Sequence, residues 1–124
     1  MIDNYLLETT RVVHQNTNER NFHIFYQLLS NKEARFKYSL SDIDSYNYVN
    51  HSGCTVVPGV NDAQEFEETR KSMEVIGLSE EERESVFATI AAILHLGNVK
   101  ITPDSKDLAE IKDKKGNKFY TTIL

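Results

Sequence analysis

Apolar residues in this sequence fall into short clusters with helical spacing, separated by polar stretches. The clearest cluster lies in residues 19–30. Its large apolar side chains recur three or four positions apart, as on one face of a helix: Phe22, Phe25, Leu28 and Leu29. Ile24 and Tyr26 broaden this face. The pattern therefore predicts a central helix that other segments cover from several sides.

The residues before this helix predict a strand. Residues 4–14 combine apolar with β-branched side chains, and the polar cluster at 15–18 is typical of a turn that ends a strand. Asn18 is the predicted N-cap of the central helix. Glu19 then lies in the first turn, where the helix dipole favours an acidic side chain.

The next stretch carries weaker signals. Residues 31–44 predict a short helix or helical loop, with Phe36, Leu40 and Ile43 docked on the core. Residues 45–59 contain turn-forming residues at both ends and predict an irregular or hairpin-like connection.

A capping signal then predicts a longer helix. Asp62 followed by Glu65 resembles a capping box with Asp62 as the cap, and Gly77 is suited to the left-handed residue after the helix end. The predicted apolar face of this helix consists of Ala63, Phe66, Met73 and Ile76.

A second capping box follows at once. Ser79 and Glu82 predict the start of another helix, which ends at Gly97. Its predicted apolar face consists of Val86, Ile90, Ile93 and Leu94. Two helices joined this closely predict a corner or hairpin. Residues 99–101 predict a short strand that Pro103 stops.

The character of the chain changes after Pro103, so we expect two regions, 1–103 and 104–124. Residues 104–118 are polar and rich in lysine, which predicts an exposed loop. Residues 119–124 either add an edge strand to a partner or are disordered.

Composition and length indicate one soluble globular domain. The chain has 124 residues, of which 40% are hydrophobic and 27% are charged. No apolar run approaches the roughly 20 residues of a membrane span, and the first residues lack the layout of a signal peptide. Cys54 is the single cysteine, which favours a reducing compartment. We therefore expect a cytoplasmic protein with no membrane partner.

The net charge of −5 is unevenly distributed. Up to residue 99 there are 8 Lys and Arg against 15 Asp and Glu, a net of −7, and from Lys100 there are 6 Lys against 4 acids, a net of +2. An acidic body without a basic and aromatic stripe argues against a nucleic-acid partner.

A search for reactive motifs finds no pattern that indicates a catalytic site in this chain. No glycine belongs to a G-x-x-x-x-G-K-[ST] phosphate loop. The histidines are far apart and do not have the spacing of zinc ligands: His14, His23, His51 and His95. Cys54 has no local base, and the many glutamates fit helix first turns and solvated faces better than an acid/base pair.

Several stretches nevertheless resemble one family. Residues 4–8, 11–13 and 19–29 resemble the myosin motor domain just after its switch I loop. Further stretches agree in kind and order with the same region of conventional, class II-like myosins: 46–54, 62–77 and 91–100. The resemblance covers about residues 2–101.

The resemblance implies an α/β but predominantly helical piece of the P-loop NTPase myosin motor fold. In the family, this region belongs to the upper fifty-kilodalton subdomain and comprises a strand at the edge of the central sheet, a central helix, a helix-turn-helix pair and a short strand. Whole motors bind ATP and magnesium and cycle on actin. Their phosphate loop, switch I and switch II lie outside this segment, so the resemblance implies no catalytic, cofactor-binding or metal-binding residue here.

The lysines after the predicted strand at 99–101 occupy the position of a surface loop that lies near actin in the family. The resemblance makes these residues candidate actin contacts: Lys106, Lys112, Lys114, Lys115 and Lys118. The alternative from the residues alone is a solubilising loop.

The chain departs from the family pattern at two places. Thr9 and Thr10 stand where the family usually has Lys-Ser, and residues after about 110 do not follow the expected Ala- and Leu-rich helix. Our preferred hypothesis is a non-catalytic fragment of an actin-activated ATPase of the cytoskeleton, with the actin filament and the remaining heavy chain as partners. The alternatives are a stand-alone helical interaction module derived from a myosin, or an enzyme in its own right.

Overall fold

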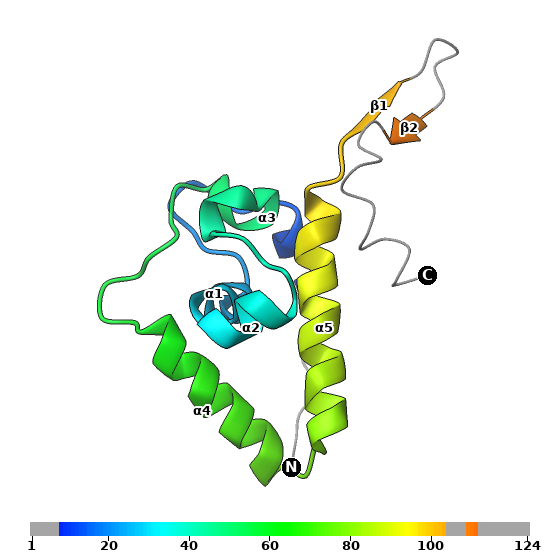
Figure 1. Cartoon of the computed structure of the whole chain (residues 1–124). Coiled ribbons are helices and arrows are strands. Elements are labelled where there is room, and N and C mark those ends of the chain that lie inside the picture. Colours follow the sequence, from blue (N-terminus) through cyan, green and yellow to red (C-terminus); the bar gives the residue numbers. More distant parts are fainter. Residues whose placement is uncertain (1–7, 104–108, 112–124) are drawn as a thin grey trace.

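The computed structural model describes residues 8–103 and 109–111, and these are mostly helical. The helical elements, in chain order, are η1 (Thr9–Val12), α1 (His23–Ser30), α2 (Lys32–Lys37), η2 (Ile43–Ser45), α3 (Asn47–Asn50), α4 (Asp62–Val75) and α5 (Glu80–Gly97). Two short strands, β1 (Ile101–Pro103) and β2 (Ala109–Ile111), pair antiparallel beyond the end of α5. Helices α4 and α5 diverge from their junction as the two arms of a V, with α1 and α2 between them (Figure 1).

Helix α1 forms the centre of the core, as the apolar pattern predicts. Phe25, Tyr26, Leu28 and Leu29 are each at most 4% exposed. The helix contacts α2, α4 and α5. Burying each such side chain stabilises the fold by roughly 1.5–3 kcal/mol. The prediction of a helix covered from several sides is confirmed.

The predicted start of this helix is wrong, because α1 begins only at His23. Asn18, the predicted N-cap, instead has a left-handed backbone with φ of 65°. The buried Asn21 side chain donates hydrogen bonds to the carbonyl oxygens of Val12 at 3.0 Å and Tyr48 at 2.7 Å. These long-range bonds hold the residues before His23 in a non-helical conformation.

The predicted N-terminal strand is wrong over its described part, residues 8–14, where η1 lies instead. The backbone there is satisfied locally, since the Arg11 amide donates to the Glu8 carbonyl and the His14 amide donates to the Thr10 carbonyl. No strand pairs with this segment among the described residues. β-branched residues indicate a strand only where neighbouring strands are available. Residues 4–7 lie outside the described residues.

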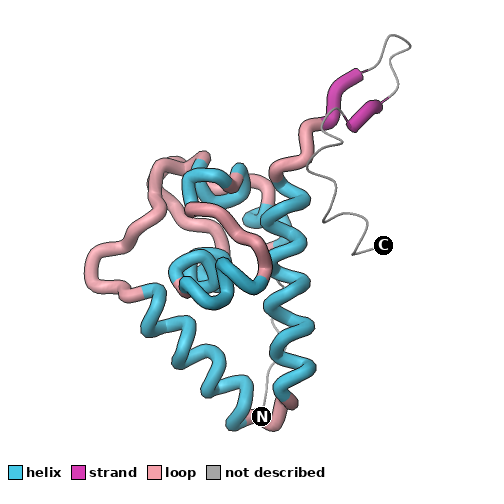
Figure 2. The backbone as a smooth tube through the Cα atoms, in the orientation of Figure 1, coloured by secondary structure: helices cyan, strands magenta, loops and turns pink. Residues whose placement is uncertain are grey.

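The segment predicted as a short helix or helical loop contains α2 and η2. Leu40 is 8% exposed and Ile43 packs against the core, as predicted. Phe36 is 90% exposed, so its predicted docking is wrong. Ala34 is the buried residue of α2, and Phe36, two positions later, lies on a different side of this short helix. The following connection is irregular except for α3 and contains no hairpin (Figure 2).

Helix α4 begins one residue earlier than its cap signal predicts. Asn61, and not Asp62, is the N-cap, and its side chain accepts a hydrogen bond from the Gln64 amide at 3.3 Å. The predicted face is half right. Phe66 is buried and Met73 packs against the core, whereas the remaining predicted members, Ala63 and Ile76, are exposed.

Both predicted signals at the α4–α5 junction are confirmed. Gly77 has φ of 95°, which favours glycine. At the start of α5, the Ser79 side chain accepts from the Glu82 amide at 3.2 Å, and the Glu82 carboxylate accepts from the Ser79 amide at 2.8 Å. The two helices form a corner, with the Phe66 and Phe87 ring centroids 5.0 Å apart between them.

The buried face of α5 is rotated from the predicted one. Phe87, Ala91 and Leu94 are buried, whereas Val86 is 38% exposed. Ile90 and Ile93, also predicted for this face, pack partly against the core. The strand predicted over 99–101 shares only its last residue with β1.

Candidate functional site

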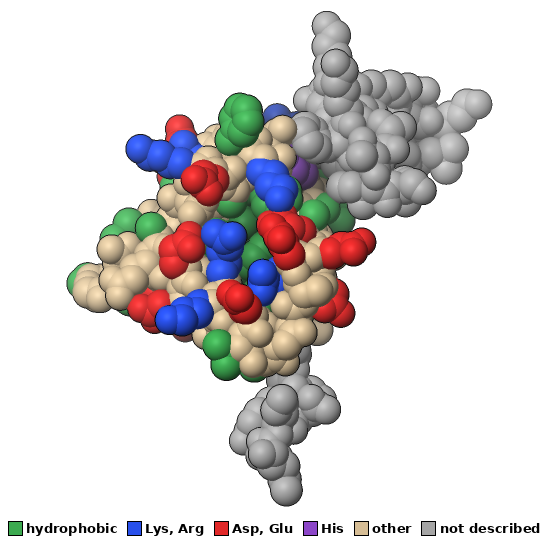
Figure 3. Space-filling view, turned by 60° about the horizontal axis from the view of Figure 1, so that its bottom comes forward, with side chains coloured by type: hydrophobic (Ala, Val, Ile, Leu, Met, Phe, Trp, Pro, Cys, Tyr) green, Lys and Arg blue, Asp and Glu red, His purple; other side chains and the backbone are tan. Residues whose placement is uncertain are grey.

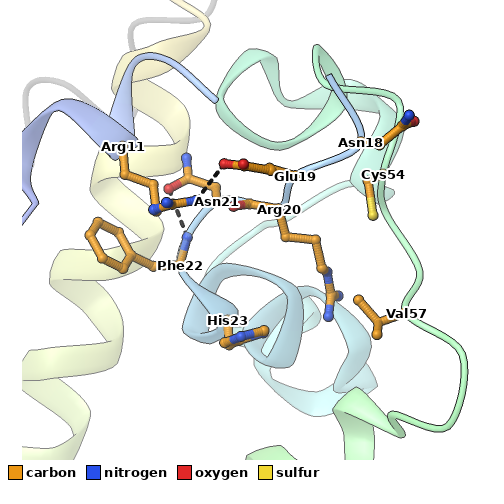
Figure 4. A pocket seen from close by; sticks show the side chains of 9 residues that line it. All are labelled: Arg11, Asn18, Glu19, Arg20, Asn21, Phe22, His23, Cys54 and Val57. Carbon is orange, nitrogen blue, oxygen red and sulfur yellow. Dashed lines mark hydrogen bonds and ion pairs between the residues drawn. The ribbon is translucent and has the colours of Figure 1, made fainter. Parts of the chain in front are cut away.

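A pocket of about 430 Å³ lies beside the N-terminal end of α1. Its walls come from Arg11 in η1, from residues 18–23, and from Cys54 and Val57 in the loop after α3 (Figure 4). The pocket combines two arginines, a histidine and the free thiol. Its chemistry depends on whether those groups are already paired.

Arg11 is already paired at this pocket. Its Nε lies 2.8 Å from a Glu8 carboxylate oxygen, and one terminal nitrogen lies 3.4 Å from Glu19 and 3.1 Å from the Arg20 carbonyl oxygen. The hydrogen bond to Glu8 raises the pKa of the Arg11 guanidinium further. Two carboxylates therefore neutralise this cation.

Arg20 forms a buried ion pair that joins three segments. Its guanidinium donates to both carboxylate oxygens of Asp62, at 2.7 and 3.1 Å, and to the Thr55 carbonyl oxygen at 3.0 Å. It also stacks over the Tyr26 ring, 3.7 Å from the ring centre. The Arg20 side chain is 3% exposed and that of Asp62 is 18% exposed. This cluster, which we call the Arg20 cluster, ties the approach to α1 to the following loop and to the start of α4.

A smaller hollow of about 210 Å³ lies between α2, α4 and α5. The Glu84 carboxylate accepts a hydrogen bond from the Tyr38 hydroxyl and pairs with the Lys37 ammonium. Lys37, and then Tyr38, lower the pKa of Glu84, while burial raises the pKa of Tyr38. The face in Figure 3 shows acidic and basic side chains around a hollow with hydrophobic side chains inside it.

The other residues considered for chemistry are scattered. His23 is exposed, and His95 is partly buried with Nε2 3.2 Å from the Tyr38 carbonyl oxygen. Cys54 is a half-buried free thiol. Within residues 8–103 and 109–111, no three His, Cys, Asp or Glu side chains are grouped to hold a metal ion. The helices in these same ranges are too short or too polar to span a membrane.

The five lysines predicted as an actin contact lie outside the described residues, so that contact stays a prediction.

The sequence did not predict the Arg20 cluster. Its one signal is a charged residue at the edge of an apolar helix, and nothing in the sequence indicates that Asp62 is its partner.

Comparison with known proteins identifies the family. The family model for the myosin head (motor domain) matches residues 1–124. The chain is 49% identical over 127 residues to the myosin ID heavy chain of Dictyostelium discoideum, covering 99% of this chain and 12% of that protein. It is 44% identical to the myosin IB heavy chain of the same organism, with 99% of this chain and 11% of that protein covered.

A third relative is myosin-1 of Emericella nidulans, 44% identical, with 99% of this chain and 10% of that protein covered. The chain thus spans about a tenth of the length of these curated relatives. Their designations are ID, IB and 1, so the likeness to class II myosins is not confirmed. On the family match and these identities, the chain belongs to the myosin head (motor domain) family.

Proposed function

We propose that this chain is a structural, non-catalytic segment of an actin-based, ATP-driven myosin motor. The observation that carries the proposal is the family match over residues 1–124. In this proposal, residues elsewhere in the motor bind ATP and magnesium. The partners of the segment are the remaining heavy chain and, through the whole motor, the actin filament. The motor works in the cytoplasm on the cytoskeleton.

The charged clusters support a structural role. Arg11, Arg20 and Glu84 each have an oppositely charged partner within the segment. Such pairs hold elements together, and they occupy the charged side chains of Arg11 and Arg20 at the first pocket and of Glu84 at the smaller hollow. The segment therefore contributes a helical support built around α1.

A graft tests this proposal. This chain would replace the matching segment of the Dictyostelium myosin ID motor, and actin-activated ATP hydrolysis would be measured. We expect activity within about tenfold of the parent, because relatives that share this much sequence keep the same core packing. A matched graft with Leu28→Asp should be inactive, since it buries an unpaired charge in the core. An inactive unmodified graft would contradict the proposal.

The isolated chain separates the alternatives. ATP hydrolysis by the 124-residue chain alone would support an enzyme in its own right, and we expect none. A monomer that unfolds cooperatively and binds a protein partner without the rest of a motor would support a stand-alone module.

We also propose that the lysines at 106, 112, 114, 115 and 118 contact actin, supported by their charge and by their position in the resemblance. In the graft, Lys112→Glu, Lys114→Glu and Lys115→Glu together should weaken actin co-sedimentation at least tenfold, because each change replaces attraction to an acidic surface by repulsion. The control is Lys32→Glu with Lys71→Glu, exposed lysines on α2 and α4. Equal weakening by both sets would reject this contact.

A further inference from the structure

The end of α5 is tied to the segment around α3, which lies 50 to 53 positions earlier in the chain. The Asn98 side chain donates a hydrogen bond to the Ser45 carbonyl oxygen at 2.6 Å and accepts one from the Asn47 amide at 2.9 Å. The Asn47 side chain donates to the Gly97 carbonyl oxygen at 3.0 Å. We call these three hydrogen bonds the asparagine clamp.

The clamp caps both of the helix ends that meet there. The first amides and the last carbonyl groups of a helix have no partner within that helix. Asn47, the first residue of α3, bonds the carbonyl of Gly97, the last residue of α5, while Asn98 bonds the Asn47 amide. Gly97 also allows a close approach of α3, since an added Cβ would lie 2.7 Å from the Tyr48 ring. The two helix ends are therefore held against each other.

The chain leaves α5 without the left-handed glycine turn that closes α4. At the end of α4, Gly77 has φ of 95° and the Leu78 amide donates back to the Met73 carbonyl at 3.0 Å. At the end of α5, the C-cap residue Asn98 has a right-handed backbone with φ of −92° and ψ of −4°. A right-handed residue does not by itself redirect the chain. The bonds of Asn98 to distant residues therefore gain weight in setting the exit direction.

The hairpin of β1 and β2 follows the clamp directly. It begins at Ile101, three positions after Asn98, and projects beyond the end of α5 (Figure 1). Ile101 is 66% exposed, so its side chain is not packed on the helices. In the sequence, Lys106 lies between the two strands, and the lysines at 112, 114, 115 and 118 follow β2. Residues 98–100 thus join the candidate actin contacts to the helical body.

We propose that Asn47 and Asn98 are positioning residues for the actin contact. By holding the end of α5 against α3, they set the direction of the chain toward the hairpin and hence the place at which the lysines meet the filament. The inference rests on the proposed actin contact of those lysines. Asn47 is exposed and Asn98 is half-buried, so their hydrogen bonds compete with water and add little to the stability of the core.

Actin affinity in the graft tests this inference. Asn47→Ala, Asn98→Ala and the double variant would be compared by the actin concentration that half-activates ATP hydrolysis. We expect each single change to raise that concentration by about threefold or more, because a contact that is less well ordered before binding has a lower affinity. The actin-free rate should stay unchanged. The double variant should lose less than the product of the two single effects, because both side chains act on one contact.

Asn61→Ala is the matched control. This exposed asparagine caps α4, where its side chain accepts a hydrogen bond from the Gln64 amide at 3.3 Å. The control should leave actin affinity unchanged. An equal loss of affinity in Asn61→Ala, or a fall in the actin-free rate of Asn98→Ala, would show a general loss of structure and overturn the positioning role.

The lysine variant separates this inference from the proposed function. When Lys112, Lys114 and Lys115 are already changed to Glu, Asn98→Ala should not weaken actin binding further, because the contact that it positions is already lost. A further loss would overturn the inference. If the lysine variant binds actin weakly and Asn98→Ala binds it normally, only the inference fails. If both bind normally, or if the unmodified graft is inactive, the proposal on which the inference rests fails with it.

Discussion

The guanidinium of Arg20 connects segments that are far apart in sequence. It reaches Thr55, 35 positions away, and Asp62, 42 positions away, while stacking on Tyr26. A buried pair of this kind adds little net stability compared with an apolar pair, yet breaking it leaves an uncompensated charge. We therefore expect its strongest effect to be on which arrangement of the loop and helices is stable.

Arg20→Met should lower the free energy of unfolding by about 3 kcal/mol, because the partly buried Asp62 carboxylate loses its counterion. Urea unfolding measures this change. The double variant Arg20→Met with Asp62→Leu should recover most of the loss, since neither charge then remains. A double variant no more stable than the single one would show that the ion pair is not the cause.

At Gly97, one added side-chain atom is expected to reverse the usual stability advantage of alanine over glycine in a helix. It is the last residue of α5, and an added Cβ would lie 2.7 Å from the Tyr48 ring. Alanine normally stabilises a helix by about 1 kcal/mol relative to glycine. Here we expect Gly97→Ala to destabilise the chain by about 1–3 kcal/mol, because the ring atoms it meets are close to the Tyr48 backbone.

Thermal unfolding of Gly97→Ala checks this expectation. In a Tyr48→Ala background, the same substitution should be neutral or stabilising, because the clash has been removed. Stabilisation by Gly97→Ala in the wild-type background would contradict the packing argument.

At the scale of elements, the features that the sequence predicts correctly are those that depend on residues close together in the chain. The Ser79 capping box and the turn at Gly77 depend on residues within a few positions, and both are confirmed. The apolar face of α1 depends on spacing alone and is also confirmed. These are the parts that a sequence pattern specifies directly.

Predictions failed where the conformation depends on contacts between residues far apart in the sequence. Asn21 hydrogen bonds to Tyr48, 27 positions away, and thereby delays the start of α1. The strand pattern before residue 14 has no pairing partner in the described part of the chain, so a 3-10 turn forms. The Arg20 cluster escaped prediction for the same reason, since a sequence pattern does not show which carboxylate a lone arginine meets.

We expect the contact between α2 and α5, in which Lys37 and Tyr38 meet Glu84, to depend on pH. Lys37 and Tyr38 lower the pKa of Glu84 below its ordinary value of 4.5, so the folded state favours the carboxylate. The resulting stabilisation is present at neutral pH and is lost as the pH falls through the lowered pKa. Glu84→Gln should therefore be less stable than wild type at pH 7, by about 0.5–1 kcal/mol for this partly exposed pair.

The difference between Glu84→Gln and wild type should shrink as the pH is lowered below about 4.5. Denaturant unfolding at pH 7, 5 and 3.5 measures it. Glu81→Gln, an exposed position on the same helix, serves as the control. A difference that is constant across this range would exclude the ionised carboxylate as its source.

At the scale of the whole molecule, the arms of the V depend on α1 for their spacing. Leu28 is 0% exposed at the centre of the core, whereas Phe36 is 90% exposed. Leu28→Ala should cost about 3 kcal/mol through lost burial and the cavity left behind. Phe36→Ala should change stability by less than about 0.5 kcal/mol.

Calorimetry or urea unfolding of both variants tests where the core lies. A large loss from Phe36→Ala would mean that its ring is covered in solution, and a small loss from Leu28→Ala would mean that α1 is not the centre.

The two caps at the α4–α5 corner also bear on the order in which the chain folds. Every hydrogen bond of those caps joins residues no more than five positions apart, as between Leu78 and Met73. Contacts this local close quickly, because little chain entropy is lost in forming them. The Arg20 cluster must instead close a loop of 42 positions. We therefore expect the corner to form first in refolding, and the arms to close on α1 in the later, slower step.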